Sequence, residues 1–94
     1  MNSKQRASLR RIANRIDTII QIGKADVTEN ILKQAEEALT ARQLIKLRVL
    51  DTASLSAHQA AELIAETLKA EVVQIIGTRF VLYRPNDEGQ KLLQ

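Results

Sequence analysis

The stretch EVVQIIGTRFVLYR, residues 71–84, places the strongest limit on how this chain can fold. Two runs rich in β-branched residues, Glu71–Ile76 and Arg79–Arg84, are separated only by Gly77 and Thr78. A two-residue loop that begins with glycine is typical of a type II′ turn, which joins antiparallel strands. The expected register pairs apolar residues on one face (Ile75 with Phe80, Val73 with Leu82) and mixed residues on the other (Ile76 with Arg79, Gln74 with Val81, Val72 with Tyr83).

Helical periodicity alternates with two further strand patterns in the rest of the chain. A first helix is expected from Ser3, as its N-cap, to about Arg15, followed by a strand at Thr18–Ile22. A second helix is expected to begin at Val27 or Thr28, because Asp26 and Glu29 have the spacing of a capping box with Asp26 as the N-cap.

The second strand pattern is LIKLRVL, at Leu44–Leu50, in which Lys46 and Arg48 alternate with apolar residues. It predicts one buried face and one wet, basic face. A third helix follows a capping box formed by Ser56 and Gln59. Its expected apolar face consists of Ala60, Leu63, Ile64 and Leu68.

The expected order of elements is therefore α-β-α-β-α-β-β, an α/β (α+β two-layer) fold with a mixed four-stranded sheet. Strands separated by helices are expected to be parallel, so the first three strands should point the same way. Their carboxyl ends share one edge of the sheet, where such folds tend to bind ligands. Gly23 and Lys24 follow the first strand at this edge, and Gly77 and Arg79 lie at the turn after the third.

The composition narrows the function classes. The chain contains no cysteine, which excludes thiol nucleophiles and Cys-ligated zinc. We find no carboxylate pair, metal-binding motif or P-loop, and Ser56 and His58 on one helix do not form a triad, so we expect no enzyme, cofactor or small-molecule substrate. No apolar run has the length of a signal peptide or membrane span, so we expect a cytoplasmic protein with no membrane partner.

Positive charge is concentrated at the start of the chain. Residues 1–24 hold six cations and one anion, which gives a net charge of +5, although the whole chain carries only +3. Five of these cations lie on the first predicted helix, namely Lys4, Arg6, Arg10, Arg11 and Arg15. That helix carries no acid to pair with them along its surface. The pattern favours a polyanionic partner such as nucleic acid or an acidic membrane surface, although a solvated helix face would show it too.

The segment IIQIGKAD, residues 19–26, has two interpretations. A glycine that can adopt a positive φ, a lysine and the first N–H groups of a helix can together hold a phosphate. The same segment can be an ordinary strand-to-helix turn that Asp26 caps. In the first case the Asp26 carboxylate would compete with phosphate for the same N–H donors, so an Asp26→Gly substitution is expected to tighten binding.

Several motifs, taken in order, resemble one family. The segments KQR and LRRIAN in the first helix, QIGK followed by TENIL, EALTARQLIKLRVL, and VQIIG followed by VLYRP resemble the CRM (chloroplast RNA splicing and ribosome maturation) domain. They also resemble its bacterial single-domain YhbY-like members. The resemblance runs from about Lys4 to Pro85, so we expect one CRM-type RNA-binding domain over residues 1–85 and a polar C-terminal tail at 86–94.

The resemblance implies both a fold and a function. The fold should resemble the C-terminal domain of bacterial translation initiation factor three. The family's RNA contact is a G-x-x-G loop, which corresponds here to Gly23, Lys24, Ala25 and Asp26, with an aspartate in place of the second glycine. The third helix also lacks the glycine that often follows it in relatives. If Lys69 or Ala70 takes a left-handed conformation there, the cost is about 1 kcal/mol.

The leading hypothesis is an RNA-binding protein that assists ribosome biogenesis by binding ribosomal RNA in precursors of the large ribosomal subunit. The predicted RNA contacts are Lys4, Arg6, Arg10, Arg11, Arg15, Gly23, Lys24, Ala25, Asp26 and Arg79. Two alternatives stay open: a protein–protein interaction module, and a small architectural protein that binds duplex DNA. Tyr83 is expected to pack in the sheet and not to stack on a base, and Lys46 and Arg48 to form an ordinary wet face.

Overall fold

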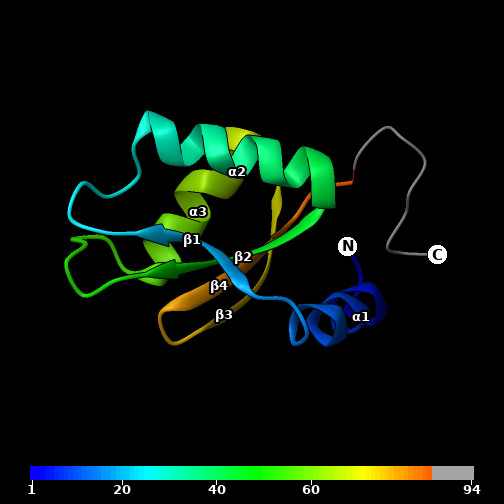
Figure 1. Cartoon of the computed structure of the whole chain (residues 1–94). Coiled ribbons are helices and arrows are strands. Elements are labelled where there is room, and N and C mark those ends of the chain that lie inside the picture. The colour runs from blue at the N-terminus through cyan, green and yellow to red at the C-terminus, as the bar shows by residue number, and fades with distance from the viewer. Residues whose placement is uncertain (86–94) are drawn as a thin grey trace.

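The computed structural model describes residues 1–85, so the polar tail expected at 86–94 lies outside the described residues (Figure 1). Three helices and four strands follow one another in the expected order. Their bounds are α1 Ser3–Ala13, β1 Thr18–Ile22, α2 Glu29–Arg42, β2 Leu44–Val49, α3 Ala57–Leu68, β3 Glu71–Ile76 and β4 Arg79–Tyr83. The predicted α/β fold is therefore confirmed.

The four strands form one mixed sheet in the order β1-β2-β4-β3. Strands β1 and β2 are parallel, whereas β4 is antiparallel to both β2 and β3. The first three strands thus point the same way, as expected, and β4 is inserted between β2 and β3. Helices α2 and α3 cover one face of the sheet, and α1 lies against the opposite face (Figure 1).

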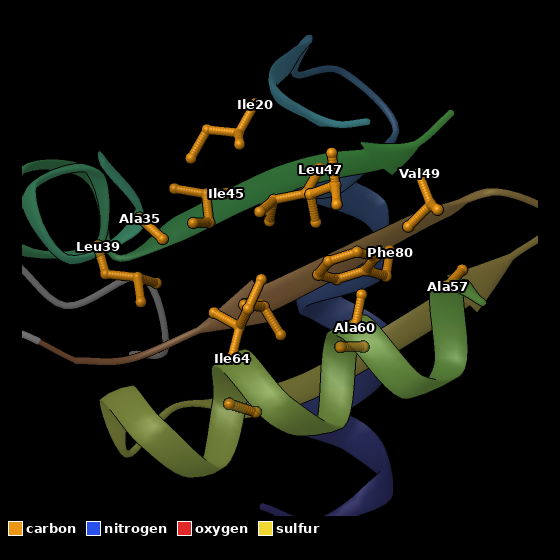
Figure 2. Packing of buried hydrophobic residues seen from close by; sticks show 14 residues of the cluster. Ile20, Ala35, Leu39, Ile45, Leu47, Val49, Ala57, Ala60, Ile64 and Phe80 are labelled. Carbon is orange, nitrogen blue, oxygen red and sulfur yellow. The ribbon is translucent and has the colours of Figure 1, made fainter. Parts of the chain in front are cut away.

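A large aliphatic cluster fills the space between the sheet and helices α2 and α3 (Figure 2). Alternate strand residues such as Ile45, Leu47 and Phe80 point into it, and Ile64 of α3 meets them. A smaller cluster on the other face joins Leu9 and Ala13 of α1 to sheet residues Leu44, Val73, Val81 and Tyr83. Each face of the sheet therefore has its own core, which follows from the period of two along the strands.

The β3–β4 hairpin follows the predicted register only near its turn. Gly77 has a φ of 59° and Thr78 is not among the positive-φ residues, as a type II′ turn requires. The predicted pairs Ile76–Arg79, Ile75–Phe80 and Gln74–Val81 are present.

Beyond these pairs the predicted register is wrong, because a β-bulge at Val73 shifts it by one residue. Val72 opposes Leu82, and Glu71 opposes Tyr83. The extra residue lets Val73 bury its side chain in the smaller cluster under α1. The Arg6 guanidinium donates hydrogen bonds to the carbonyls of Val72 (2.6 Å) and Val73 (3.1 Å) and so ties α1 to the bulge.

Two predicted helix starts are wrong by one or two residues, and one is confirmed. The N-cap of α1 is Asn2, which forms a capping box with Gln5, and α1 ends at Ala13, before the expected Arg15. The N-cap of α2 is Thr28, whose hydroxyl accepts a hydrogen bond from the N–H of Ile31. The capping box that begins α3, Ser56 with Gln59, is present as predicted.

The face that α3 buries also differs from the expectation. Leu63 is 45% exposed, and the residues in contact with the sheet side are Ala57, Ala60, Ala61, Ile64 and Ala65. Four small alanines allow the helix to lie close to the sheet, so the buried stripe is rotated away from Leu63. The helix ends at Lys69, which takes the left-handed conformation (φ 56°, ψ 45°) anticipated for a chain without glycine there.

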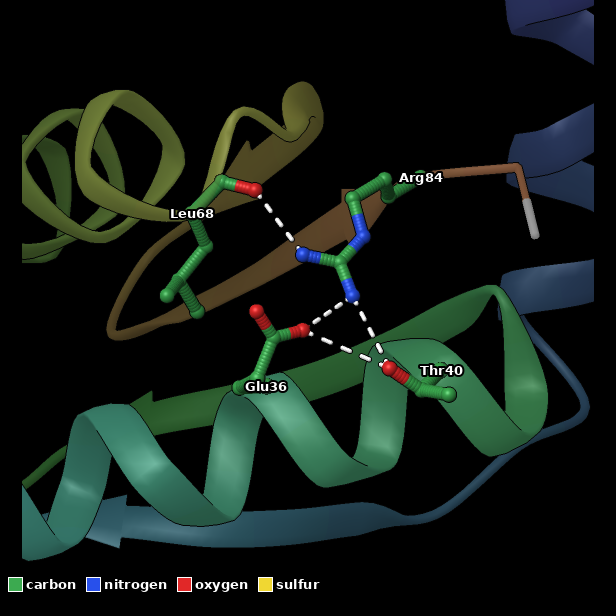
Figure 3. Close-up of polar contacts among 4 residues, drawn as sticks. All are labelled: Glu36, Thr40, Leu68 and Arg84. Carbon is green, nitrogen blue, oxygen red and sulfur yellow. Dashed lines mark hydrogen bonds and ion pairs between the residues drawn. The ribbon is translucent and has the colours of Figure 1, made fainter. Parts of the chain in front are cut away.

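Arg84 joins three elements where the chain leaves the sheet (Figure 3). Its guanidinium donates to the Leu68 carbonyl at the end of α3 (2.9 Å) and to the Thr40 hydroxyl on α2 (3.0 Å), and it pairs with the Glu36 carboxylate. This pairing holds the pKa of Glu36 below its usual range. Arg84 is therefore a structural residue within the described part of the chain.

Candidate nucleic-acid interface

Residues 23–26 form a tight turn directly after β1. The Asp26 N–H donates to the Gly23 carbonyl at 2.9 Å, which closes the turn over Lys24 and Ala25. Both of these residues are exposed. Lys24 thus extends from the tip of a closed turn at the carboxyl edge of the sheet.

Gly23 does not use the conformational freedom that the sequence suggested. Gly77 is the glycine with positive φ in residues 1–85, and in the turn the left-handed residue is Asp26, with a φ of 57°. Aspartate tolerates this region better than most residues, because its short polar side chain can form local hydrogen bonds. A Cβ at Gly23 would lie 3.4 Å from the Thr52 hydroxyl, so the β1 turn and the loop after β2 are close neighbours.

The Asp26 carboxylate is bonded to that neighbouring loop and does not cap α2. It accepts hydrogen bonds from the backbone N–H of Ser54 (2.8 Å), the backbone N–H of Leu55 (3.1 Å) and the Ser54 hydroxyl (2.6 Å). These bonds, the one from the Ser54 hydroxyl foremost, lower the pKa of Asp26. The predicted capping role of Asp26 and its predicted competition for the helix N–H groups are therefore both wrong.

The N-terminus of α2 is separate from the lysine turn. The helix begins at Glu29, and Ala25–Val27 lie between Lys24 and the cap at Thr28. The Thr28 hydroxyl already accepts a hydrogen bond from the Ile31 N–H, and Glu29 adds a negative charge to the first turn. This helix end therefore has fewer free N–H donors and a weaker positive charge for a phosphate than the sequence suggested.

The cations of α1, together with Arg15 in the turn directly after it, fall into two groups. Lys4, Arg10, Arg11 and Arg15 are exposed, whereas Arg6 is half-buried and bonded to the β3 bulge. None of the four exposed cations forms an ion pair or a side-chain hydrogen bond within residues 1–85. Strand β1 leads away from α1, so the lysine turn lies at the other end of the sheet from this helix (Figure 1).

Arg79 lies at the start of β4, at the same edge of the sheet as the lysine turn. The Thr78 carbonyl accepts from the N–H of Val49 (2.8 Å), and the Ile22 carbonyl accepts from the N–H of Leu50 (2.8 Å). These bonds connect the hairpin turn, the end of β2 and the end of β1 in one row. The structure therefore brings Arg79 and Lys24 to one edge of the sheet, with β2 between them.

Tyr83 and His58, two other polar side chains, contact neighbouring residues of the protein itself. Tyr83 is buried in the smaller cluster, and burial together with the nearby Glu71 raises the pKa of its hydroxyl. His58 lies exposed on α3 and meets Glu62 one turn later at 2.9 Å. Residues 1–85 contain no cluster of three metal-ligating side chains, and no helix among them is long and apolar enough to cross a membrane.

Comparison with known proteins yields a consistent set of relatives. The family model described as the CRS1 / YhbY (CRM) domain matches residues 1–84. The probable RNA-binding protein YqeI of Bacillus subtilis is 36% identical over 98% of this chain and 96% of its own length. An RNA-binding protein of Haemophilus influenzae is 31% identical over 96% of this chain and 91% of its own length.

A solved structure agrees with these matches. The solution structure of a hypothetical protein from Staphylococcus aureus, described as a candidate RNA-binding protein, superposes with a TM-score of 0.77. The two chains are 37% identical, and the match covers 96% of this chain and 94% of the other.

Proposed function

Because this chain belongs to the CRS1/YhbY (CRM) domain family, a non-enzymatic family, we propose that it is an RNA-binding protein. The relatives named above are described as RNA-binding proteins, and each aligns with this chain over most of its length. We further propose that the RNA is ribosomal RNA in precursors of the large subunit, and that the protein acts on them in the cytoplasm. The resemblance of its motifs to bacterial YhbY-like members supports this part.

The observation that carries the proposal is the unpaired positive charge of α1 and of Arg15, in the turn that follows it. Lys4, Arg10, Arg11 and Arg15 are exposed and have no acidic partner within residues 1–85. Such a surface attracts the phosphate backbone, because each phosphate that it neutralises releases condensed counterions. Arg6 supports this surface indirectly, since its guanidinium fixes α1 to the sheet.

The turn at residues 23–26 supplies a second contact in this proposal. Lys24 and Ala25 project from it, and the turn is closed by the bond from Asp26 to Gly23 and tied to Ser54 and Leu55. A lysine on a turn fixed in this way can meet a phosphate without first ordering its loop, which reduces the entropic cost of binding. In this arrangement Asp26 positions the turn and does not contact the RNA.

Titration of the purified protein with a structured fragment of large-subunit ribosomal RNA tests the proposal. Lys24→Ala and Arg11→Ala should each weaken binding and reduce the slope of log affinity against log salt by about 0.7 to 0.9, the value for one lost phosphate contact. Lys33→Ala is the matched control, because Lys33 is exposed on α2, on the other face of the sheet. Equal affinities and slopes for all three variants would rule out α1 and the lysine turn as the contact surface.

The ribosomal part of the proposal needs a measurement in cells. The tagged protein should sediment with large-subunit precursor particles in a sucrose gradient, and ribonuclease treatment should release it. A protein found only at the top of the gradient would contradict the ribosomal assignment and leave RNA binding itself in place. Association that survives ribonuclease would favour protein contacts as the basis of attachment.

A further inference from the structure

We infer that the part of the sheet that α1 leaves uncovered holds one unpaired nucleotide of the RNA, separately from the phosphate contacts on α1 and at the lysine turn. This inference rests on the proposed function, since it presumes an RNA partner. The site is a hollow of about 130 Å³ between the end of α1 and strands β2, β4 and β3. Its lining residues are Ala13, Asn14, Lys46, Gln74, Ile76, Arg79 and Val81.

The volume of the hollow limits the size of the ligand group that it can hold. A volume of about 130 Å³ has room for one small group such as a single planar ring system, and is far too small to enclose a base-paired helix. A wider, more open hollow continues from it along β3 past Arg6 and Arg10, and both hollows share Asn14, Gln74 and Ile76. A strand of RNA can therefore place one nucleotide in the smaller hollow while its backbone follows the larger one towards α1.

The charges around the hollow favour an anionic ligand. Arg48 of β2 lies directly opposite Arg79 of β4 in the antiparallel register, so both project from the same face as Lys46. Like charges at directly opposed positions destabilise a sheet. None of these three cations forms an ion pair within the described chain, and the Nε of Arg48 is buried there without a hydrogen-bond partner. Asp17 lines a neighbouring hollow together with Lys46 but forms no ion pair with it.

The other lining groups fit a nucleobase. Ile76 is an apolar residue 63% exposed, and Ala13 and Val81 add an apolar floor against which the flat face of a base can pack. Asn14 and Gln74 each carry an amide that can both donate to and accept from the edge of a base. Unpaired bases are recognised by stacking on aromatic side chains or arginine planes and by hydrogen bonds to their edges. This chain has only one Phe and one Tyr, so arginine planes and amide groups are the means it offers.

Nuclear magnetic resonance provides a direct test with short oligouridylate, oligoadenylate and oligocytidylate as probes. The side-chain amide resonances of Asn14 and Gln74 should shift on addition of at least one of these probes. Those of Asn30 and Gln34, which are exposed on α2, should stay in place. A duplex RNA of the same length should leave the Asn14 and Gln74 amides unshifted.

Two double variants separate base recognition from phosphate attraction. The double variant Asn14→Ala with Gln74→Ala should reduce the ratio of affinities between the most tightly and the least tightly bound oligonucleotide by about two- to tenfold, the value of one hydrogen bond. Its salt slope should be unchanged. Lys46→Ala with Arg79→Ala should reduce the salt slope by about 1.4, two contacts at about 0.7 each for single strands. Thermal melts of each variant confirm that it is folded.

The outcomes distinguish the two proposals. If the wild-type protein binds RNA and Lys24→Ala weakens it, but both sheet variants bind all the probes like the wild type, the nucleotide site is wrong and the proposed function stands. If duplex RNA shifts the Asn14 and Gln74 amide resonances as much as the single strands do, the nucleotide site is also wrong, because the shifts would then reflect contact with the RNA backbone alone. If the wild type binds none of these RNAs, the proposed function fails together with the inference.

Discussion

The Asp26 carboxylate fixes the turn that carries Lys24, although in the proposed function it does not itself contact the RNA. It is bonded to two backbone N–H groups and one hydroxyl in the loop that follows β2, at 2.6 to 3.1 Å. Its own backbone is left-handed, which allows the turn to close over Lys24. An aspartate at the position where the resemblance implies glycine therefore replaces backbone freedom with a fixed connection between two loops.

Asp26→Asn should destabilise the protein at neutral pH, because the amide accepts these three hydrogen bonds less well than the carboxylate. The pKa of Asp26 is lowered in the folded state, so its contribution is fully present above the unfolded value of about 3.9 and is lost as the pH falls through the folded value below it. Denaturant titrations of both proteins should therefore differ at pH 7 and converge at the acid end of this window.

Asp51→Asn is the matched control for that substitution. It makes the same charge change at an exposed aspartate that has no side-chain hydrogen bond within residues 1–85. Relative to this control, Asp26→Asn should also weaken RNA binding, since the turn that carries Lys24 is less well fixed. If Asp26→Asn binds RNA more tightly than Asp51→Asn does, the Asp26 carboxylate competes with RNA phosphate, as the sequence suggested.

Local sequence patterns could not reveal the role of Asp26. Asp26 and Glu29 match a capping box, but Thr28 is an equally good cap two residues later, and the structure uses Thr28. The choice depends on donors at Ser54 and Leu55, which are 28 and 29 residues away. By contrast, the Ser56–Gln59 capping box was predictable, because both of its partners lie within one turn.

At the scale of elements, helix α1 depends on Arg6 for its position. The Arg6 guanidinium donates to two carbonyls at the β3 bulge, and the apolar contacts beneath it are few: Leu9 and Ala13 are the buried residues of the helix. Arg6 thus couples the cationic helix to the strand whose register is irregular. Its predicted direct contact with RNA stays a prediction beside this structural role.

Arg6→Ala should lower the free energy of unfolding by about 1 to 2 kcal/mol, because two charge-assisted hydrogen bonds in a half-buried setting are lost. Arg10→Ala on the same helix should change it by no more than about 0.5 kcal/mol, since Arg10 is exposed. Urea denaturation of the three proteins measures both. If Arg6→Ala is as stable as Arg10→Ala but binds RNA less tightly, Arg6 acts mainly as an RNA contact.

Element types were predictable from periodicity, but the details of their packing were not. The alternation in LIKLRVL correctly predicted that Ile45, Leu47 and Val49 are buried. In α3 the large residue Leu63 was expected inside and is exposed, because the closely packed alanine stripe fixes the rotation of the helix. The bulge at Val73 depends on α1, a partner that the hairpin sequence does not contain.

At the scale of the whole molecule, one sheet separates two environments. Helices α2 and α3 complete the larger core on one face, whereas α1 covers only part of the other and leaves Lys46, Arg48 and Arg79 on its open part. The sequence placed Lys46 and Arg48 on a wet face, and the hairpin register placed Arg79 beside Ile76. Their common surface follows only from the insertion of β4 between β2 and β3.

Arg84→Lys should lower the stability of the whole domain by about 1 kcal/mol, after allowance for the solvent exposure of its partner Glu36. A lysine cannot reach the Leu68 carbonyl, the Glu36 carboxylate and the Thr40 hydroxyl together, so at least one connection between α2 and α3 is lost. Arg42→Lys, at an exposed position on α2, is the control and should stay within about 0.5 kcal/mol of the wild type. Equal melting temperatures for the two variants would contradict this role.

The bond between Asp26 and Ser54 also has an evolutionary consequence. A homologue with glycine at the position of Asp26 has no carboxylate to satisfy, so selection for a hydroxyl at the position of Ser54 should be relaxed in it. Chains that retain the aspartate should retain serine or threonine at that position. Covariation between these two positions across the family would therefore record which members fix the turn through a side chain and which through glycine alone.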